Sequence, residues 1–179
     1  MLRARGFAFG NKARVGKDEA CKVLMESYGA EKVSLAEPVY EIANYIQQVL
    51  GLPQEKNRKL LQFIGEGLRE ILGQDIWLDV ARRKIREASL ENKMVCISDM
   101  RYRNEADAFA AMGLVLVHID RSDRPAVENP YHISEVDLDT YQFDLYMWND
   151  STLEEFRHAV AQLPNQLRDH DFEILKARI

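Results

Sequence analysis

Short apolar runs alternate along this chain with segments of helical periodicity, and this alternation limits the folds open to it. The runs at residues 5–9, 94–99 and 114–119 are short enough to be buried strands, whereas residues 17–28 and 104–112 carry apolar residues at helical spacing. Strands that alternate with helices build a parallel sheet covered by helices on both faces. The sequence therefore predicts an α/β fold, a three-layer sandwich around a mainly parallel open sheet.

The same signals predict the remaining elements. We expect two more strands and four more helices, the strands at residues 31–35 and 143–148 and the helices at residues 38–50, 57–72, 76–88 and 153–163. Residues 120–140 show no periodicity and are expected to be irregular. No repeat or long linker divides the chain, so we expect one domain over residues 1–179.

Charge and cysteine usage exclude several classes of protein. The chain has 24 basic and 29 acidic residues, whereas proteins that bind nucleic acid or membrane surfaces usually carry a basic excess. No uncharged run approaches the roughly 18 residues of a membrane span, and no signal peptide is evident. The two cysteines, Cys21 and Cys96, stand apart in apolar segments. We therefore expect a cytoplasmic protein with neither nucleic acid nor membrane as a partner.

The segment between the first strand and the first helix ends in Gly16-Lys17, where a phosphate-binding P-loop belongs. In such loops backbone N–H groups and the lysine surround phosphate oxygens. Asn11 stands in place of the usual first glycine, and asparagine tolerates left-handed backbone angles. Asp18 replaces the usual hydroxyl ligand of Mg²⁺, and a carboxylate can fill that role. The alternative is a strand–turn–helix with an incidental Gly-Lys pair.

Charged residues follow two other expected strands. Asp99 and Arg101 come after one strand, and Arg121 and Arg124 follow the next. Ligands of open α/β sheets bind at the carboxyl ends of the strands, so these side chains should meet the loop there. Asp99 could orient Mg²⁺ or merely cap a helix, and Arg101 could clamp a phosphate or lie on the surface.

Six segments occur in an order and spacing that match one known family. They are Asn11–Asp18, Leu35–Val39, residues 61–77, Asp99–Ala106, His132–Glu135 and Asn149–Leu153. The first resembles the GKARSGKD loop of bacteriophage deoxynucleoside monophosphate kinases, in which aspartate follows the lysine. The others are similar to the FADPL, LLQ–G–R–W, DVRFPNEA, HxSE and NDGTL segments of that family. Together the matches span residues 7–157.

This resemblance implies a P-loop kinase fold with a helical acceptor-binding region at about residues 36–90 and a lid at about residues 120–140. It implies transfer of a phosphoryl group from ATP to a deoxynucleoside 5′-monophosphate, assisted by Mg²⁺, in the host cytoplasm if the chain is phage-encoded. Apolar residues near the C-terminus could pack against a partner, so the sequence allows a homodimer. These residues are Phe172, Ile174 and Leu175.

The expected site residues fall into four groups. The donor nucleotide is expected to contact Asn11, Lys12, Ala13, Arg14, Val15, Gly16, Lys17, Asp18 and Glu19. The catalytic cations are expected to be Lys17, Arg101, Arg121 and Arg124. The acceptor is expected to contact Glu37, Gln62, Arg69, Trp77, Asp99, Arg101, Asn104, His132 and Glu135. The expected ligands of Mg²⁺ are Asp18 and Asp99.

Several of these residues have a plainer interpretation. Arg69 could simply be exposed, Trp77 could belong to the core rather than stack on a base, and Asn104 could cap a helix. Residues 120–140 could form a solvated loop instead of a lid. His132 could be a general base or could order the lid; zinc binding is disfavoured because no second His or Cys stands at ligand spacing.

Two other functions stay open. Animal-type phosphomevalonate kinases share an SGKD loop and a D-x-R pattern, so the acceptor could be a phosphorylated metabolite that is not a nucleotide. The altered loop residues Asn11, Val15 and Glu19 also permit a nucleotide-binding protein that has lost turnover.

Overall fold

The computed structural model describes residues 5–126 and 131–169. Residues 127–130 of the expected lid lie outside the described residues, and so do Phe172, Ile174 and Leu175, on which the expectation of a homodimer rests.

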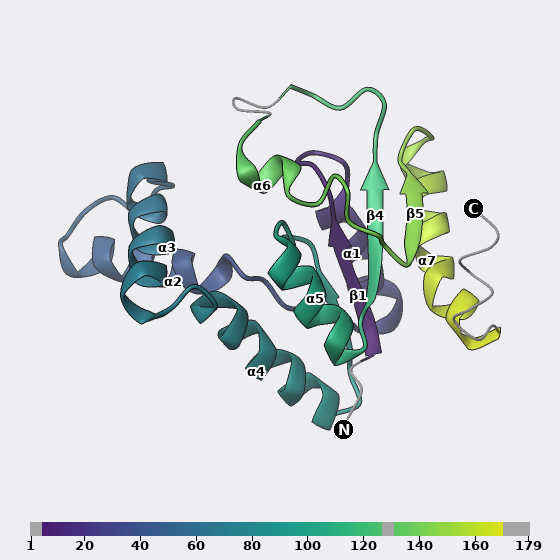
Figure 1. Ribbon diagram of the computed structural model, residues 1–179, viewed down its shortest axis with the longest axis horizontal. Helices are drawn as coiled ribbons and strands as arrows, with labels where there is room; N and C mark the ends of the chain where they lie inside the picture. The colour runs from purple at the N-terminus through teal and green to yellow at the C-terminus, as the bar shows by residue number, and fades with distance from the viewer. Residues whose placement is uncertain (1–4, 127–130, 170–179) are drawn as a thin grey trace.

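A five-stranded sheet forms the centre of the molecule (Figure 1). Its strands are β1 (Arg5–Gly10), β2 (Glu31–Lys32), β3 (Met94–Ile97), β4 (Val115–Asp120) and β5 (Leu145–Trp148). They lie in the order β2-β3-β1-β4-β5, and every neighbouring pair is parallel. Ala8 on the central strand pairs with Ile97 on one side and Leu116 on the other. The predicted α/β class and parallel open sheet are confirmed.

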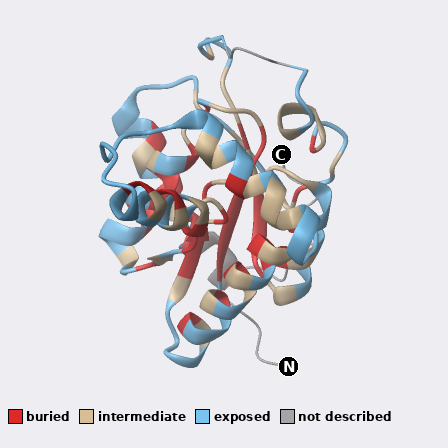
Figure 2. Ribbon diagram, turned by 90° about the vertical axis from the view of Figure 1, so that its left-hand side faces the viewer, coloured by how far each residue is buried: buried red, intermediate tan, exposed pale blue. Residues whose placement is uncertain are grey.

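Helices cover both faces of this sheet. They are α1 (Lys17–Tyr28), α2 (Glu37–Val49), α3 (Arg58–Leu72), α4 (Ile76–Leu90), α5 (Arg103–Met112), α6 (Ile133–Val136) and α7 (Leu153–Asp169). Side chains alternate along a strand, so Phe9 packs with residues of α1 and α7, whereas Ala8 packs with residues of α4 and α5. Figure 2 shows the buried residues concentrated on the strands and on the inner faces of the helices. These are the three predicted layers.

The second strand is shorter than the predicted run of residues 31–35. After Lys32 a single further bond continues the pairing, from the N–H of Val33 to the carbonyl oxygen of Cys96 (3.0 Å). Ser34 then turns the chain, because its Oγ accepts hydrogen bonds from the N–H groups of Ala36 (3.2 Å) and Glu37 (3.1 Å). The prediction was wrong here because a local side-chain bond competes with the ladder.

Two other differences from prediction exceed two residues. The segment expected to be irregular contains one helical turn, α6, in which the side chain of His132 accepts a hydrogen bond from the N–H of Ser134. Helix α7 does not end at Leu163 but continues through Pro164 to Asp169. Leu163 and Pro164 are both buried, so packing outweighs the one backbone hydrogen bond that proline removes.

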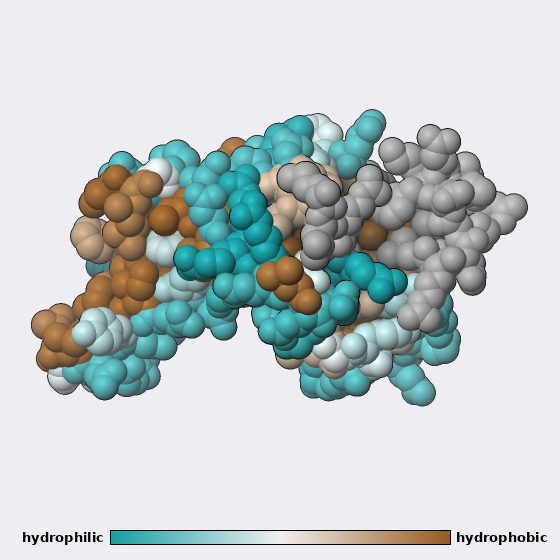
Figure 3. Space-filling model, turned by 90° about the horizontal axis from the view of Figure 1, so that it is seen from below, coloured by the Kyte–Doolittle hydropathy of each residue, from teal (hydrophilic) through white to brown (hydrophobic). Residues whose placement is uncertain are grey.

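Helices α2, α3 and α4 extend to one side of the sheet, and their surface is partly apolar. Figure 3 shows a hydrophobic area over α2 and α3, at the left end of that view. The large exposed apolar side chains of this region are Tyr40, Tyr45, Val49, Leu50, Leu52, Phe63, Ile71 and Leu72. In the part of the chain that the structure describes, no helix is both long and apolar enough to span a membrane.

Candidate active site

The loop between β1 and α1 turns sharply through left-handed backbone angles. Three of its residues have positive φ angles, at Asn11 (94°), Arg14 (65°) and Gly16 (108°). A Cβ on Gly16 would lie 2.6 Å from Nδ2 of Asn149, so only glycine fits there. The loop thereby leads into the N-terminus of α1, where unpaired N–H groups favour an anion.

Asn11 anchors the loop to the neighbouring strand. Its side chain is buried, and Nδ2 donates hydrogen bonds to the carbonyl oxygen of Ile119 (3.0 Å) and to Nε2 of His118 (2.9 Å). Burial lowers the pKa of His118, which favours the neutral ring that an accepting Nε2 requires. Asparagine in place of the first glycine is therefore built into the loop and does not disrupt it.

Lys17 is buried under the same loop. Only 6% of the residue is exposed, and Nζ donates hydrogen bonds to the carbonyl oxygens of Asn11 (2.9 Å) and Lys12. Burial, and next the positive charge of Arg101, lower the pKa of Lys17 to about 7. A bound polyphosphate would supply the negative charge that this ammonium group lacks.

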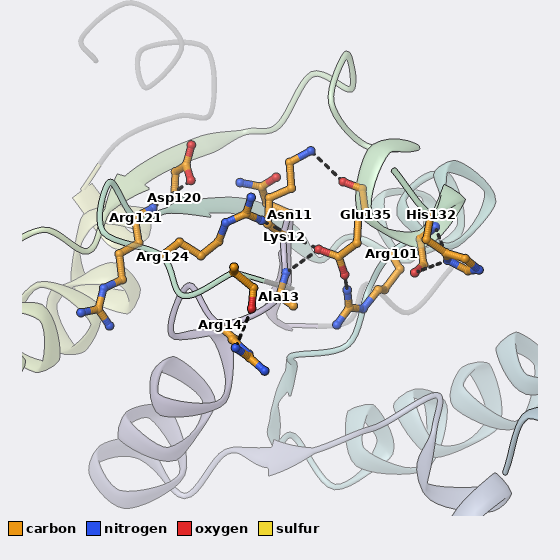
Figure 4. A network of polar contacts seen from close by, with 12 residues as sticks. Asn11, Lys12, Ala13, Arg14, Arg101, Asp120, Arg121, Arg124, His132 and Glu135 are labelled. Carbon is orange, nitrogen blue, oxygen red and sulfur yellow. Dashed lines mark hydrogen bonds and ion pairs between the residues drawn. The ribbon is translucent and has the colours of Figure 1, made fainter. Parts of the chain in front are cut away.

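An acidic side chain from α6 reaches the loop. Oε2 of Glu135 accepts a hydrogen bond from the backbone N–H of Ala13 (3.0 Å), and Oε1 accepts one from Nη1 of Arg101 (Figure 4). Nη1 of Arg124 lies 3.9 Å from Oε2, and the carbonyl oxygen of Glu135 accepts a bond from Nζ of Lys12 (2.7 Å). The carboxylate of Glu135 thus occupies the hydrogen-bond donors that would bind a phosphate oxygen.

The charge state of Glu135 agrees with this arrangement. Burial acts to raise the pKa of Glu135, but the N–H of Ala13 and the guanidinium of Arg101 outweigh it and lower that pKa below its ordinary value. Nη1 of Arg124 is buried and has no hydrogen-bond partner within the described residues. Arg124 therefore has a donor left for a further anion.

Arg121 stands apart from this group. Its Nη2 donates a hydrogen bond to Oδ2 of Asp123 (3.0 Å). In Figure 4 its side chain is directed away from Glu135, whereas Arg124 points toward it. The structure thus brings Arg101 and Arg124 together at the loop, but not Arg121.

Asp99 lies just after β3, beside the loop. Its Oδ2 accepts hydrogen bonds from Oγ of Ser34 (2.6 Å) and from the N–H of Ala36 (3.0 Å). Its Oδ1 is buried and finds no hydrogen-bond partner among the residues that the structure describes. A buried carboxylate oxygen without a partner is costly unless a cation or a donor satisfies it.

Asp18 is tied to the sheet. Its Oδ1 accepts hydrogen bonds from Nζ of Lys32 (2.8 Å) and from Oγ of Ser98 (2.7 Å). Burial acts to raise the pKa of Asp18, but the bonds from Lys32 and Ser98 together lower it. Lys32 therefore shares this carboxylate with any cation that binds there.

The two carboxylates border one cavity. Asp18 and Asp99 line a space of about 190 Å³ together with Lys17, Ser98 and Arg101. Residues 5–126 and 131–169 contain no group of three or more His, Cys, Asp or Glu side chains that could hold a metal alone. Mg²⁺ usually takes one or two carboxylates and completes its shell with water and substrate phosphate. The donor set, with the unpartnered Oδ1 of Asp99, fits that pattern.

A second cavity lies beside α3 and α5. It measures about 170 Å³ and is lined by Arg69, Gln74, Leu78, Tyr102, Asn104 and Glu105. Cζ of Arg69 lies 5.4 Å from the centre of the Tyr102 ring. Arg69 and Asn104, both expected on the acceptor side, thus meet at one cavity.

Other expected residues lie elsewhere. Trp77 is 5% exposed and donates its indole N–H to the carbonyl oxygen of Gly65 (2.9 Å), which matches the core alternative. Nζ of Lys84 donates a hydrogen bond to Oε2 of Glu37 (2.6 Å), and Nε2 of Gln62 donates one to Oε1 of Glu66 (3.3 Å).

Four further residues serve the scaffold in this structure. Nδ1 of His132 accepts a hydrogen bond from the N–H of Ser134 (3.3 Å) and caps α6. Glu19 on α1 pairs with Arg157 on α7. Val15 is fully buried and Arg14 donates to the carbonyl oxygen of Ala126 (2.7 Å).

Comparison with known proteins shows the family of this chain. The family model described as deoxynucleotide monophosphate kinase matches residues 44–160. The chain belongs to this family.

Its relatives include viral proteins. A protein of Acanthamoeba polyphaga mimivirus, provisionally described as a deoxynucleotide monophosphate kinase, is 29% identical over 79% of this chain and 86% of its own length. The uncharacterized protein ORF77 of Ictalurid herpesvirus 1 (strain Auburn) is 33% identical over 86% of this chain and 68% of its own length.

Solved structures show the same fold. The dephospho-CoA kinase from Campylobacter jejuni has a TM-score of 0.54 at 15% identity, covering 91% of this chain and 97% of that one. A gluconokinase from Sinorhizobium meliloti 1021 has a TM-score of 0.51 at 14% identity, covering 95% of this chain and 100% of that one. This deoxynucleotide monophosphate kinase family member thus has a P-loop kinase fold, and its family places it among the nucleotide-binding phosphotransferases that act on small metabolites.

Two residues that build the site were not assigned to it from the sequence. Nδ2 of Asn149, at the end of β5, donates a hydrogen bond to the carbonyl oxygen of Val15 (2.9 Å) and so holds the loop. Glu105 contacts both the Arg101 turn and Arg69. Asn149 follows a strand at the carboxyl edge of the sheet, which is a usable signal. Glu105 stands in the first turn of α5, the position of an ordinary helix-capping residue, and offers no such signal.

Proposed function

We propose that this chain transfers the γ-phosphoryl group of ATP to a deoxynucleoside 5′-monophosphate, assisted by Mg²⁺. The observation that carries the proposal is the binding of the Glu135 carboxylate at the loop by the N–H of Ala13 and by Arg101, with Arg124 close by. In a member of a kinase family, such an arrangement is suited to the phosphoryl group that moves.

The donor would be held by the loop and by Lys17. Lys17 is already directed under the loop by its bonds to the carbonyl oxygens of Asn11 and Lys12. The negative charge of the donor nucleotide would restore the ammonium form of Lys17 at neutral pH, because an adjacent anion raises the pKa of a lysine. Bound Mg²⁺ would neutralise charge on the β and γ oxygens, and Asp99 and Asp18 are the residues that would hold it.

The transfer itself requires positioning and charge neutralisation more than covalent chemistry. Arg101 and Arg124 would spread the charge of the γ-phosphoryl group once Glu135 gives up its place. Arg69 and Asn104 would hold the acceptor at the second cavity. The acceptor phosphate is the nucleophile and is ionised at neutral pH, so no strong general base is needed.

An ADP-release assay over a panel of acceptors tests this proposal. The four deoxynucleoside monophosphates are compared with mevalonate phosphate and with ATP alone. We expect release that depends on Mg²⁺ and on at least one deoxynucleotide. Activity only with mevalonate phosphate would favour the metabolite kinase, and nucleotide binding without turnover would favour a protein that binds but does not catalyse.

Alanine substitutions of the two arginines in the expected lid should lower kcat by different amounts. Arg124→Ala should lower kcat about a hundredfold with little change in the Kd of ATP, because contacts made mainly in the transition state affect rate. Arg124→Lys should recover only part of the lost kcat, since lysine lacks the planar guanidinium group with its paired N–H donors. Arg121→Ala, the matched variant three residues away, should lower kcat less, since Arg121 is paired with Asp123. Equal effects in both variants, measured by steady-state kinetics, would contradict this ranking.

Glu135→Gln should strengthen nucleotide binding. The ionised side chain now occupies the place of a phosphate oxygen at the N–H of Ala13, so a neutral side chain should compete less. We expect the Kd of ATP, measured by calorimetry, to fall about fivefold, on the scale of one ordinary hydrogen bond. Asp139→Asn, which alters another α6-side contact of Lys12, serves as control. Weaker binding by Glu135→Gln would show that this carboxylate supports the nucleotide instead.

A further inference from the structure

Glu105 connects the two cavities of the site. The residue is 4% exposed, although it is a glutamate at the start of α5. Its Oε2 accepts hydrogen bonds from the backbone N–H groups of Arg101 (2.8 Å) and Tyr102 (3.1 Å). Its Oε1 lies 3.9 Å from Nη2 of Arg69. One oxygen thus holds the turn that carries Arg101, while the other faces the arginine of the second cavity.

Helix capping explains only half of this arrangement. A glutamate in the first turn commonly accepts a hydrogen bond from the N-cap backbone N–H, and Oε2 of Glu105 does so. Capping requires neither the burial of the carboxylate nor an arginine opposite its second oxygen. The position of Oε1 therefore needs another reason.

Arg69 has unused bonding capacity at this point. Its Nε is buried and lacks a hydrogen-bond partner within residues 5–126 and 131–169. The separation of 3.9 Å from Glu105 is too long for a hydrogen bond, so the ion pair is loose. A ligand with closely spaced oxygens could satisfy Nε and replace Glu105 as the partner of the guanidinium group.

We propose that Glu105 is a positioning residue for the acceptor: Oε2 fixes the Arg101 turn, and Oε1 is a counter-ion of Arg69 that yields its place to the acceptor phosphate. This inference rests on the proposed function, in which Arg69 binds that phosphate. Two anions beside one arginine repel each other. Glu105 relieves the repulsion by taking up a proton on Oε1, while Oε2 keeps its two backbone bonds.

The surroundings of Glu105 make this proton uptake accessible near neutral pH. Burial raises the pKa of Glu105 to about 7, although the N–H groups of Arg101 and Tyr102 and the charge of Arg69 act to lower it. The negative charge of Asp99 also acts to raise the pKa of Glu105. As the pH rises through this pKa, Oε1 becomes ionised and competes with the acceptor phosphate, and as the pH falls through it the competition is lost.

Glu105→Gln tests the competition. Its amide oxygen can still accept both backbone bonds, so the cap is kept while the charge is lost. At pH 8.5 we expect this variant to bind a deoxynucleoside monophosphate about fivefold more tightly than the wild type, with equal Kd values at pH 6 and equal ADP affinity throughout. Equal acceptor affinity at pH 8.5, or weaker binding by the variant at both pH values, would overturn the proposal.

A second measurement requires no acceptor. Carboxyl NMR titration of Glu105 should show a higher pKa in Arg69→Met than in the wild type, because methionine removes the counter-ion but keeps an apolar stem. An unchanged pKa would refute the ion pair and the inference with it. The two hypotheses can fail separately. If the pKa of Glu105 responds to the Arg69 substitution but the protein binds no deoxynucleoside monophosphate, the proposed function is refuted and the ion pair is not.

Discussion

Replacing Lys17 with alanine should lower kcat about a thousandfold or more, the scale on which a transition-state cation acts in phosphoryl transfer. Lys17 is 6% exposed, and its ammonium group is held under the loop by two carbonyl oxygens, so alanine leaves the loop without its buried cation. Steady-state ADP release with saturating acceptor measures the change. Turnover within tenfold of the wild type, in a folded Lys17→Ala protein, would refute the P-loop assignment.

The same variant should not lose stability. The pKa of Lys17 is lowered from 10.5 to about 7, so burial disfavours its charged form. The unfolded chain therefore binds more protons than the folded one between these values, and wild-type stability should rise as pH increases from 7 toward 10. Lys17→Ala should lack this rise in thermal unfolding. Lys22→Ala, an exposed lysine on the same helix, is the matched control and should change neither kcat nor the pH slope.

Replacing Asp99 with asparagine should lower kcat about a hundredfold and raise the Mg²⁺ concentration for half-maximal activity about tenfold. Asparagine keeps an oxygen that can accept the bonds from Ser34 and from the N–H of Ala36, so the turn before α2 is preserved. The negative charge at Oδ1 is lost. A magnesium titration of ADP release measures both quantities.

Asp107→Asn is the control for this variant. Asp107 is an exposed carboxylate on α5 that accepts a hydrogen bond from the hydroxyl of Tyr141 (2.8 Å), outside both cavities. The Asp107→Asn substitution should leave the magnesium requirement unchanged. If Asp99→Asn behaved in the same way, Asp99 would serve only to hold Ser34 and the chain that follows it.

Local sequence patterns were sufficient for the framework of this protein. The predicted helix at residues 17–28 is α1 as observed, and the predicted strand at residues 94–99 contains β3. The positive φ angle of Asn11 also follows from the residue itself. Each of these features depends on neighbours a few positions away, through side-chain period, turn geometry or helix stop signals. The motifs that indicated the family are also short stretches of sequence, so they too could be recognised without the tertiary structure.

Partner choice at the site depended on the tertiary structure. Glu135 and Ala13 are 122 positions apart, and Arg101 and Glu135 are 34 apart. Residue type alone did not distinguish Arg124, which faces the loop, from Arg121, which pairs with Asp123. Periodicity reports which side of an element is buried but not which distant side chain it meets. The loop, the arginines and Glu105 are brought together only because parallel strands end at the same edge of one sheet.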